Sequence, residues 1–202
     1  MPLLTSREVA DIVGDRTGLH PTTLWVRTLA AVGILADHGT GVHVRVDADD
    51  LAEFLATHPY RPTLPFDHLA VSVGELTADP QFVLAPPHPQ WRSHAGYDHH
   101  NTAGLSPTDR ARAITGAWRL GTTIAEHVVD AGLPLVASVK GVITPDLIYW
   151  PRAVIPLTGG TVGFDVDPEH RGHDGIGTGA ITDVPRGNVW RLVTTAPESG
   201  AR

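Results

Sequence analysis

The chain has 202 residues, of which 42% are hydrophobic, and it carries a formal net charge of −7 at pH 7. It has no cysteine, which excludes disulfides and thiolate metal sites, so any metal would be held by histidine and carboxylate groups. No apolar run is long enough to cross a membrane, and the first residues lack the basic start and apolar stretch of a signal peptide. We therefore expect a soluble, cytoplasmic protein that is long enough for two small domains.

A first helix is predicted close to the N-terminus. Thr5 and Glu8 have the spacing of a capping box, in which each side chain accepts a hydrogen bond from the backbone amide of the other residue. Val9 and Val13 then supply part of an apolar face, and Gly14 predicts the end of the helix.

A second helix is predicted from Pro21 to Gly33. Proline suits the first helical position because its φ is already correct and it has no amide that needs a partner. Leu24, Leu29 and Val32 follow at helical spacing and predict the buried stripe of this helix.

A β-hairpin and a third helix are predicted next. The apolar pair 34–35 and the alternating stretch 42–46 flank the turn-forming residues 37–41, which is typical of a hairpin whose second-strand valines face the core. Asp47 is the expected cap of the third helix, Ala48–Thr57.

Five short motifs in residues 1–58, under a third of the chain, carry a resemblance to a known family. They are Ser6–Ala10, Thr22–Trp25, Gly33–Leu35, Val42–Val46 and Asp49–Leu55. Their order resembles that of the MerR and excisionase-like winged helix-turn-helix family. The resemblance implies that the second helix enters the major groove of double-stranded DNA and that the hairpin is the wing.

On this reading, the second helix and the wing supply the contacts to DNA, while Trp25 either covers the hydrophobic seam or is exposed. The expected DNA-binding residues are Arg16, Thr22, Thr23, Arg27, His43 and Arg45. Residues 1–60 contain four arginines and eight acids, a net charge of −4, which is unfavourable for a protein that contacts phosphates. Most of these acids stand at helix starts, however, where they complement the helix dipole.

Residues 59–65 contain three prolines in seven positions and predict a linker between domains 1–58 and 66–202. Such a linker is expected to have few buried contacts and to be sensitive to proteases.

The C-terminal part is predicted to combine one long helix with a sheet. Ser106 and Pro107 are strong start signals for a helix that runs to about Asp130. Short β-like runs separated by turn residues lie on both sides of it, at 66–76, 133–143, 147–150, 153–157, 161–166, 176–184 and 189–195. The predicted fold class is α+β, with the long helix packed on a mostly antiparallel, curled β-sheet.

One polar run in this part is a candidate metal site. Alternation along a strand would place Asp165 and Asp167 on one face, and His170 and His173 follow. The competing interpretation is a solvated strand end and turn, which we prefer.

A second histidine cluster consists of His88, His94, His99 and His100. It would hold Zn²⁺ if the loop folded back, but it lacks helical His-x-x-x-His spacing, so a polar loop is the preferred interpretation.

The leading functional hypothesis is a DNA-binding regulator or accessory factor whose C-terminal domain senses a ligand, dimerises or recruits a partner. The first alternative is an interaction or structural component whose winged helix docks a protein, which the acidic balance favours. The second alternative is a metal-dependent enzyme acting on nucleic acid or nucleotides. No complete catalytic constellation or phosphate-binding loop is present in the sequence, so we favour a non-enzymatic role and expect no cofactor.

Overall fold

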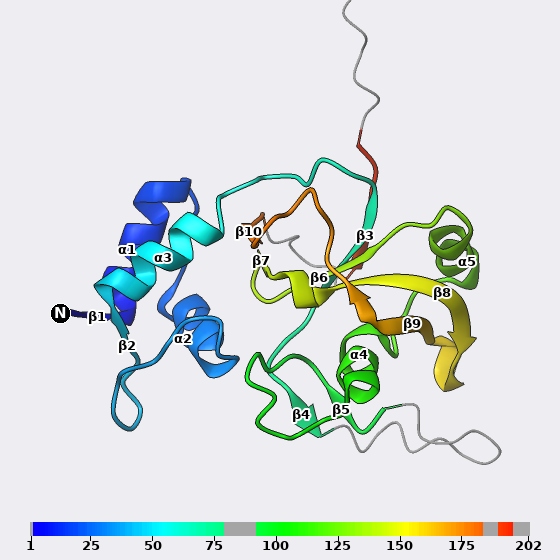
Figure 1. The fold of residues 1–202 in the computed structure, drawn as a ribbon, viewed down its shortest axis with the longest axis horizontal. Helices are drawn as coiled ribbons and strands as arrows, with labels where there is room; N and C mark the ends of the chain where they lie inside the picture. Colours follow the sequence, from blue (N-terminus) through cyan, green and yellow to red (C-terminus); the bar gives the residue numbers. More distant parts are fainter. Residues whose placement is uncertain (1, 79–91, 184–189, 196–202) are drawn as a thin grey trace, which may run out of the picture.

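The computed structural model describes residues 2–78, 92–183 and 190–195. Its N-terminal part contains β1 Leu3–Thr5, α1 Ser6–Thr17, α2 Thr23–Ala31, β2 Arg45–Asp47 and α3 Ala48–Thr57. The remainder contains β3 His68–Ser72, β4 Thr77–Ala78, β5 His94–Ala95, α4 Pro107–Thr115, α5 Thr122–Asp130, β6 Leu135–Ser138, β7 Val142–Ile143, β8 Ile148–Pro156, β9 Val162–Arg171, β10 Ala180–Ile181 and β11 Trp190–Val193. Helices and strands are both present, as an α+β chain requires (Figure 1).

Helix α1 begins with the predicted capping box but ends later than predicted. The Thr5 hydroxyl accepts from the Glu8 amide (3.2 Å), and the Glu8 carboxylate accepts from the Thr5 amide (2.7 Å). Gly14 lies inside the helix, and the cap is Gly18, whose φ of 73° is left-handed and whose amide donates to the Gly14 carbonyl. The predicted end at Gly14 is wrong because one glycine costs a helix only about 1 kcal/mol, which does not stop it.

Helix α2 begins after Thr22, whose hydroxyl accepts from the Trp25 amide, rather than at Pro21. Trp25, Val26 and Leu29 are its buried residues, whereas Leu24, predicted to lie in the buried stripe, is 61% exposed. Consecutive residues are about 100° apart on a helix. Because the Trp25 indole is buried in the core, Leu24 points to solvent, and its predicted burial is wrong.

The predicted hairpin of residues 34–46 is not formed. The amides of Ile34 and Leu35 both donate to the Leu29 carbonyl, at 2.9 and 3.2 Å, because the chain leaves α2 through a left-handed Gly33. These residues are therefore unavailable as a strand, and β2 pairs antiparallel with β1 instead.

The stretch between α2 and β2 is an irregular loop, and its valines differ in burial. Val42, expected to face the core, is 78% exposed, while Val44 is half-buried and Val46 is buried. The alternation predicted for this stretch therefore holds only where β2 begins. Helix α3 is confirmed, with Asp47 as its N-cap.

The proline-containing segment 59–65 is held more firmly than a linker with few buried contacts would be. Leu64 is 2% exposed and belongs to a small hydrophobic cluster with β6 and β7. The Arg61 amide donates to the Ile181 carbonyl (2.8 Å), and the Ile181 amide donates to the Pro59 carbonyl (3.1 Å). These contacts argue against rapid proteolysis here, although the division into two domains stays a prediction.

The main sheet has five strands in the order β11-β3-β6-β8-β9. The β3–β6 pair is parallel and the other pairs are antiparallel, so the expected mostly antiparallel sheet is present. Helix α4 packs on β9 and α5 packs on β8. Within the described residues, no helix combines the length and apolar character needed to cross a membrane.

The single long helix predicted up to Asp130 is two helices. Helix α4 ends at Thr115 with Gly116 as its C-cap, Ala117 has a φ of 60°, and α5 begins after Gly121. Between them, Trp118 exchanges two backbone hydrogen bonds with Val162 of β9, at 2.8 and 2.9 Å. The backbone amide and carbonyl of Trp118 are therefore hydrogen-bonded to the edge of β9 and cannot form the bonds of a continuous helix.

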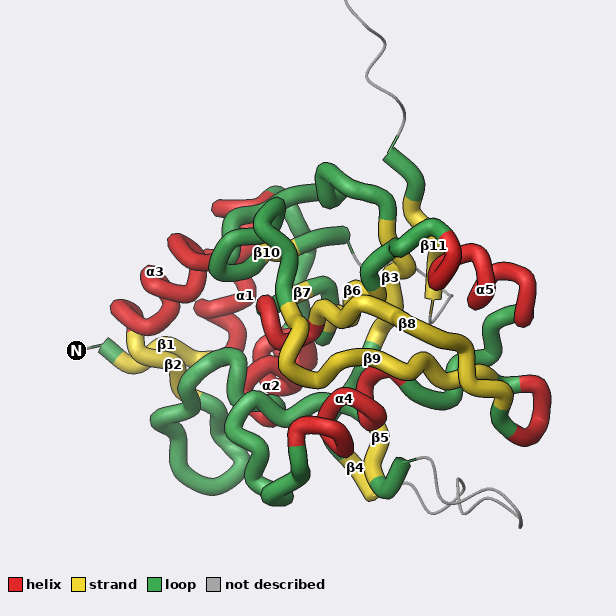
Figure 2. Tube along the Cα trace, turned by 45° about the vertical axis from the view of Figure 1, so that its right-hand side comes forward, coloured by secondary structure: helices red, strands yellow, loops and turns green. Residues whose placement is uncertain are grey.

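The N-terminal helices gather on one side of the molecule and contact the sheet-containing part (Figures 1 and 2). The Trp25 indole donates to the Lys140 carbonyl (2.9 Å), and the His99 amide donates to the Val32 carbonyl (2.8 Å). The Thr178 hydroxyl donates to the Thr57 carbonyl (2.7 Å). Several segments far apart in sequence therefore hold α2 and α3 against the sheet-containing part.

Candidate functional site

The outward face of α2 is the best-defined candidate interface among the predicted site residues. Thr23, Leu24 and Arg27 are exposed and follow the spacing of one helix face. Thr22 caps the helix and is also exposed, so its hydroxyl accepts from the Trp25 amide and keeps a proton to donate outward. This face can therefore offer two hydroxyls and one guanidinium to a partner.

The loop 36–44 is shaped by one aspartate. Asp37 Oδ1 accepts from the Gly39 amide (2.8 Å) and from the Arg45 amide (3.0 Å), and the His38 amide donates to the Arg45 carbonyl (2.8 Å). These bonds close the base of the loop. His43 lies exposed between that base and the tip.

The remaining two predicted DNA contacts differ in availability. Arg16 is exposed in the last turn of α1. Arg45 is half-buried in β2, and its Nη1 donates to the Val44 carbonyl (3.3 Å). The structure thus divides the six residues among the cap and face of α2, the end of α1, and the loop with β2.

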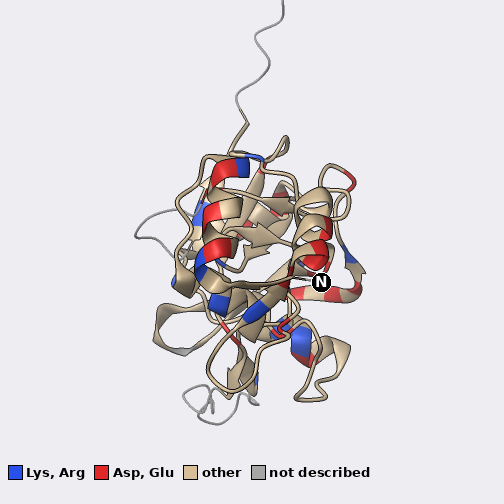
Figure 3. Cartoon of the chain, turned by 90° about the vertical axis from the view of Figure 1, so that its left-hand side faces the viewer, with Lys and Arg blue, Asp and Glu red and all other residues tan. Residues whose placement is uncertain are grey.

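The acids of the N-terminal part mostly serve local structure. The hydrogen bond from the Thr5 amide holds the pKa of the Glu8 carboxyl below its ordinary value. Asp47 caps α3 and Asp50 pairs with His38 (2.6 Å). Helix α2 itself contains no acid, although both signs of charge occur on this side of the molecule (Figure 3).

The four candidate metal ligands of β9 and the following turn have other contacts. Asp167 forms an ion pair with Arg152, and Asp165 is exposed. His173 stacks on Phe66, with ring centroids 3.6 Å apart, and both His173 and His170 stack with Trp150, at 5.7 and 5.8 Å. The described parts of the chain contain no group of three or more His, Asp or Glu residues that could hold a metal.

The second histidine cluster is also dispersed. His88 lies outside the described residues. His94 Nδ1 is 2.8 Å from the Ser93 hydroxyl, His99 Nδ1 is 2.8 Å from the Tyr97 hydroxyl, and His100 lies beside Gly33. The His99 and His100 rings meet edge to face, with centroids 5.3 Å apart, but no third His, Asp or Glu joins them as a metal ligand among the described residues.

A buried polar network around Tyr97 was not predicted from the sequence. The Tyr97 hydroxyl donates to Asp146 (2.7 Å), and the same carboxylate oxygen lies 3.6 Å from Arg110. Burial raises the pKa of the Tyr97 hydroxyl. Because these residues come from three separate segments, no local pattern could have identified the network, in which Tyr97 is buried and Arg110 and Asp146 are partly exposed.

Comparisons of this chain with protein-family models, with curated proteins and with solved structures found no match.

Proposed function

We propose that this protein binds double-stranded DNA, as a regulator or accessory factor, and that the outward face of α2 reads the bases. The observation that carries the proposal is the exposure of Thr23 and Arg27 on a helix whose opposite face is buried. A recognition helix must be held rigidly while a row of polar side chains stays free, and α2 meets both conditions.

The chemistry of this face suits base and phosphate contacts. An arginine can donate two parallel hydrogen bonds to O6 and N7 of guanine, and a threonine hydroxyl can serve either a base or a phosphate. Arg27 and Thr23 would make such contacts, with the hydroxyl of Thr22 next to them. Since α2 carries no acid, no fixed negative charge of its own opposes the approach of a phosphate.

Two further groups would position the complex without reading sequence. Arg16 and His43 are exposed at the end of α1 and in the loop 36–44, where they could meet phosphates on either side of the helix. Arg45 would add a weaker contact, because part of its guanidinium is bonded to the Val44 carbonyl.

Selection of duplexes from a random-sequence pool at low salt tests the proposal. We expect one sequence class to be enriched, and Arg27→Ala to weaken its binding by about 1–3 kcal/mol and relax specificity at one position. Arg45→Ala should reduce the slope of log affinity against log salt by at most about one unit. Arg119→Ala, an exposed arginine between α4 and α5, is the matched control. Enrichment of no sequence, or wild-type binding by both variants, would remove the proposal.

A second candidate function is docking of a protein partner by the same elements. The large apolar side chains that are exposed among the described residues are Leu3, Leu24 and Val42, and all three lie in the N-terminal part. Exposed apolar side chains gain most from contact with another protein. The net charge of −4 over residues 1–60 also favours a protein over DNA.

The two candidates differ in which side chains matter. Changing Leu24 and Val42 together to serine should leave DNA affinity nearly unchanged if α2 reads bases through Arg27. If the surface docks protein, the double variant should lose association, and a second copy of the chain is the first partner to test, by sedimentation velocity over a range of concentrations. Arg27→Ala should then have little effect.

A further inference from the structure

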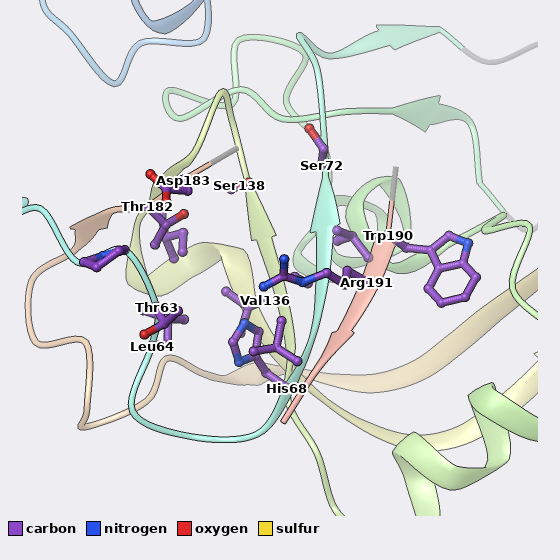
Figure 4. A pocket seen from close by; sticks show the side chains of 15 residues that line it. Thr63, Leu64, His68, Ser72, Val136, Ser138, Thr182, Asp183, Trp190 and Arg191 are labelled. Atoms are coloured by element: carbon purple, nitrogen blue, oxygen red, sulfur yellow. The ribbon is translucent and has the colours of Figure 1, made fainter. Parts of the chain in front are cut away.

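A pocket opens on the face of the main sheet opposite the large core (Figure 4). Its floor is formed by β3, β6 and β11. Residues 62–64 and Thr182–Asp183 form the opposite wall. The cavity has a volume of about 50 Å³, which is room for a small group, and it is open on one side.

The strand register explains which side chains line the floor. Ala70 of β3 pairs with Val136 of β6 and with Arg191 of β11, so these three share one face. Alternation along the strands adds His68 and Ser72 to that face. Leu69, Leu135 and Ala137, by contrast, point to the other face and join the large core.

His68 presents a neutral imidazole to the pocket. The side chain is 4% exposed, and its Nδ1–H donates to the Phe66 carbonyl (2.8 Å). Burial lowers the pKa of the ring, which favours the neutral form. Nε2 then carries the lone pair, and this ring contributes no positive charge to the pocket.

Arg191 brings the positive charge. Figure 4 shows its side chain leaving β11 into the middle of the pocket, with the guanidinium on the side of His68, while the neighbouring Trp190 turns away. Among the described residues, no hydrogen bond or ion pair engages the Arg191 guanidinium or the hydroxyls of Ser72 and Ser138. The nearby Asp183 instead accepts from the Tyr60 hydroxyl (2.8 Å).

We propose that this pocket binds a small monocarboxylate with a short apolar chain. The Arg191 guanidinium would take the carboxylate in the two-pronged geometry that planar groups allow, with the hydroxyls of Ser72 and Ser138 beside it. The chain would lie on Leu64, Val136 and Ile143, which are buried and apolar.

Charge balance selects a carboxylate over a phosphate. The residues that line the pocket include one guanidinium, that of Arg191, one carboxylate, that of Asp183, and an imidazole whose pKa burial lowers. Arg191 can therefore pair with one negative charge of a ligand, and a second negative charge would have no cationic partner in this lining. The apolar side chains of the lining also disfavour inorganic phosphate, because they would bury oxygen atoms without hydrogen-bond partners. This site does not depend on the proposed DNA contact, since none of its residues lies on α2.

The test uses the full chain, labelled with ¹⁵N, and sodium butanoate as the probe. Butanamide has the same shape without the charge, and inorganic phosphate has the charge without the apolar chain. We expect butanoate to shift the resonances of His68, Ser72, Ser138 and Arg191, and to bind about tenfold more tightly than butanamide or phosphate.

Two variants keep the proposal falsifiable. Arg191→Gln should weaken butanoate binding about tenfold and leave butanamide binding unchanged, because only the charged contact is lost. Ala70→Leu fills the pocket and should weaken both ligands, and Arg119→Gln is the control that should weaken neither. The proposal is overturned if butanoate shifts resonances elsewhere, if phosphate binds as tightly as butanoate, or if Arg191→Gln binds butanoate like the wild type.

Discussion

The two faces of helix α2 differ in burial, and we expect them to differ in their effect on stability. Its inner face, with Trp25, Val26 and Leu29, is buried, and the Trp25 indole reaches the Lys140 carbonyl in the sheet-containing part. Its outer face, with Thr23 and Arg27, makes no contribution to the core. The packing of α2 therefore depends on one side of the helix, and the other side can be mutated with little effect on stability.

The inner face also determines where the outer face points. Trp25 packs edge-on against Phe54 of α3, with ring centroids 6.5 Å apart, and the Val32 carbonyl accepts from the His99 amide. These contacts fix the rotation of α2 about its own axis. Replacing inner-face residues should therefore lower stability, whereas replacing outer-face residues should leave stability nearly unchanged.

The largest expected effect follows from Trp25→Ala. Removing a buried aromatic side chain leaves a cavity and unpairs the Lys140 carbonyl, so unfolding should be easier by about 3–5 kcal/mol, measured by urea denaturation. Trp25→Phe keeps most of the packing and should lose less. A change below about 1 kcal/mol for Trp25→Ala would contradict the assignment of the inner face.

The next effect concerns the exit from α2. Gly33 has a φ of 79°, and a Cβ there would lie 2.4 Å from the His100 ring. Gly33→Ala should therefore destabilise the chain by about 1–2 kcal/mol from backbone strain, with the contact adding to it. Gly41→Ala is the matched control, since Gly41 has a φ of 68° and nothing within 4 Å. Equal melting temperatures for the two variants would mean that the His100 contact contributes nothing.

A smaller effect depends on pH and on His58, which lies behind the inner face and stacks on Phe54. Burial lowers the pKa of His58 below 6.5, and its Nε2 has no hydrogen-bond partner within the described part of the chain. The unfolded chain then takes up the proton more readily than the folded chain. Stability should thus be full above about pH 6.5 and should fall as the pH drops below it.

Thermal melts between about pH 5 and pH 8 measure this dependence. His58→Gln should reduce the slope across the lower half of that range, and the slope that remains includes the contribution of His68, whose pKa is also lowered by burial. His43→Gln, which replaces an exposed histidine, should leave the slope as in the wild type. An unchanged slope in His58→Gln would show that another group titrates.

The smallest effect on stability belongs to the outer face. Leu24→Ser and Arg27→Ala should each change the free energy of unfolding by less than about 0.5 kcal/mol, because neither side chain is buried. Chemical denaturation checks this, with Val26→Ala as the inner-face comparison. A clear loss of stability in Leu24→Ser would show that the outer face is packed, and the separation of the two faces would fail.

Local signals in the sequence determined several features of this protein. The capping box of Thr5 and Glu8, the cap at Asp47 and the start of α4 after Ser106 could be predicted because each depends on residues within one turn. Such interactions need no knowledge of the rest of the chain. The helical spacing of the second helix predicted the burial of Leu29 and Val32 correctly but not that of Leu24.

Tertiary structure decided the features that depend on distant partners. The backbone of Trp118 pairs with β9 and breaks the predicted long helix, and β2 pairs with β1 because the chain leaving α2 had already used the amides of residues 34–35. Trp25 is buried and its indole donates a hydrogen bond to the Lys140 carbonyl. Because neighbouring residues lie about 100° apart on a helix, Leu24 then faces solvent. The pocket around Arg191 likewise exists only through the register of three strands, which pairs Ala70 with Val136 and with Arg191, residues far apart in the chain.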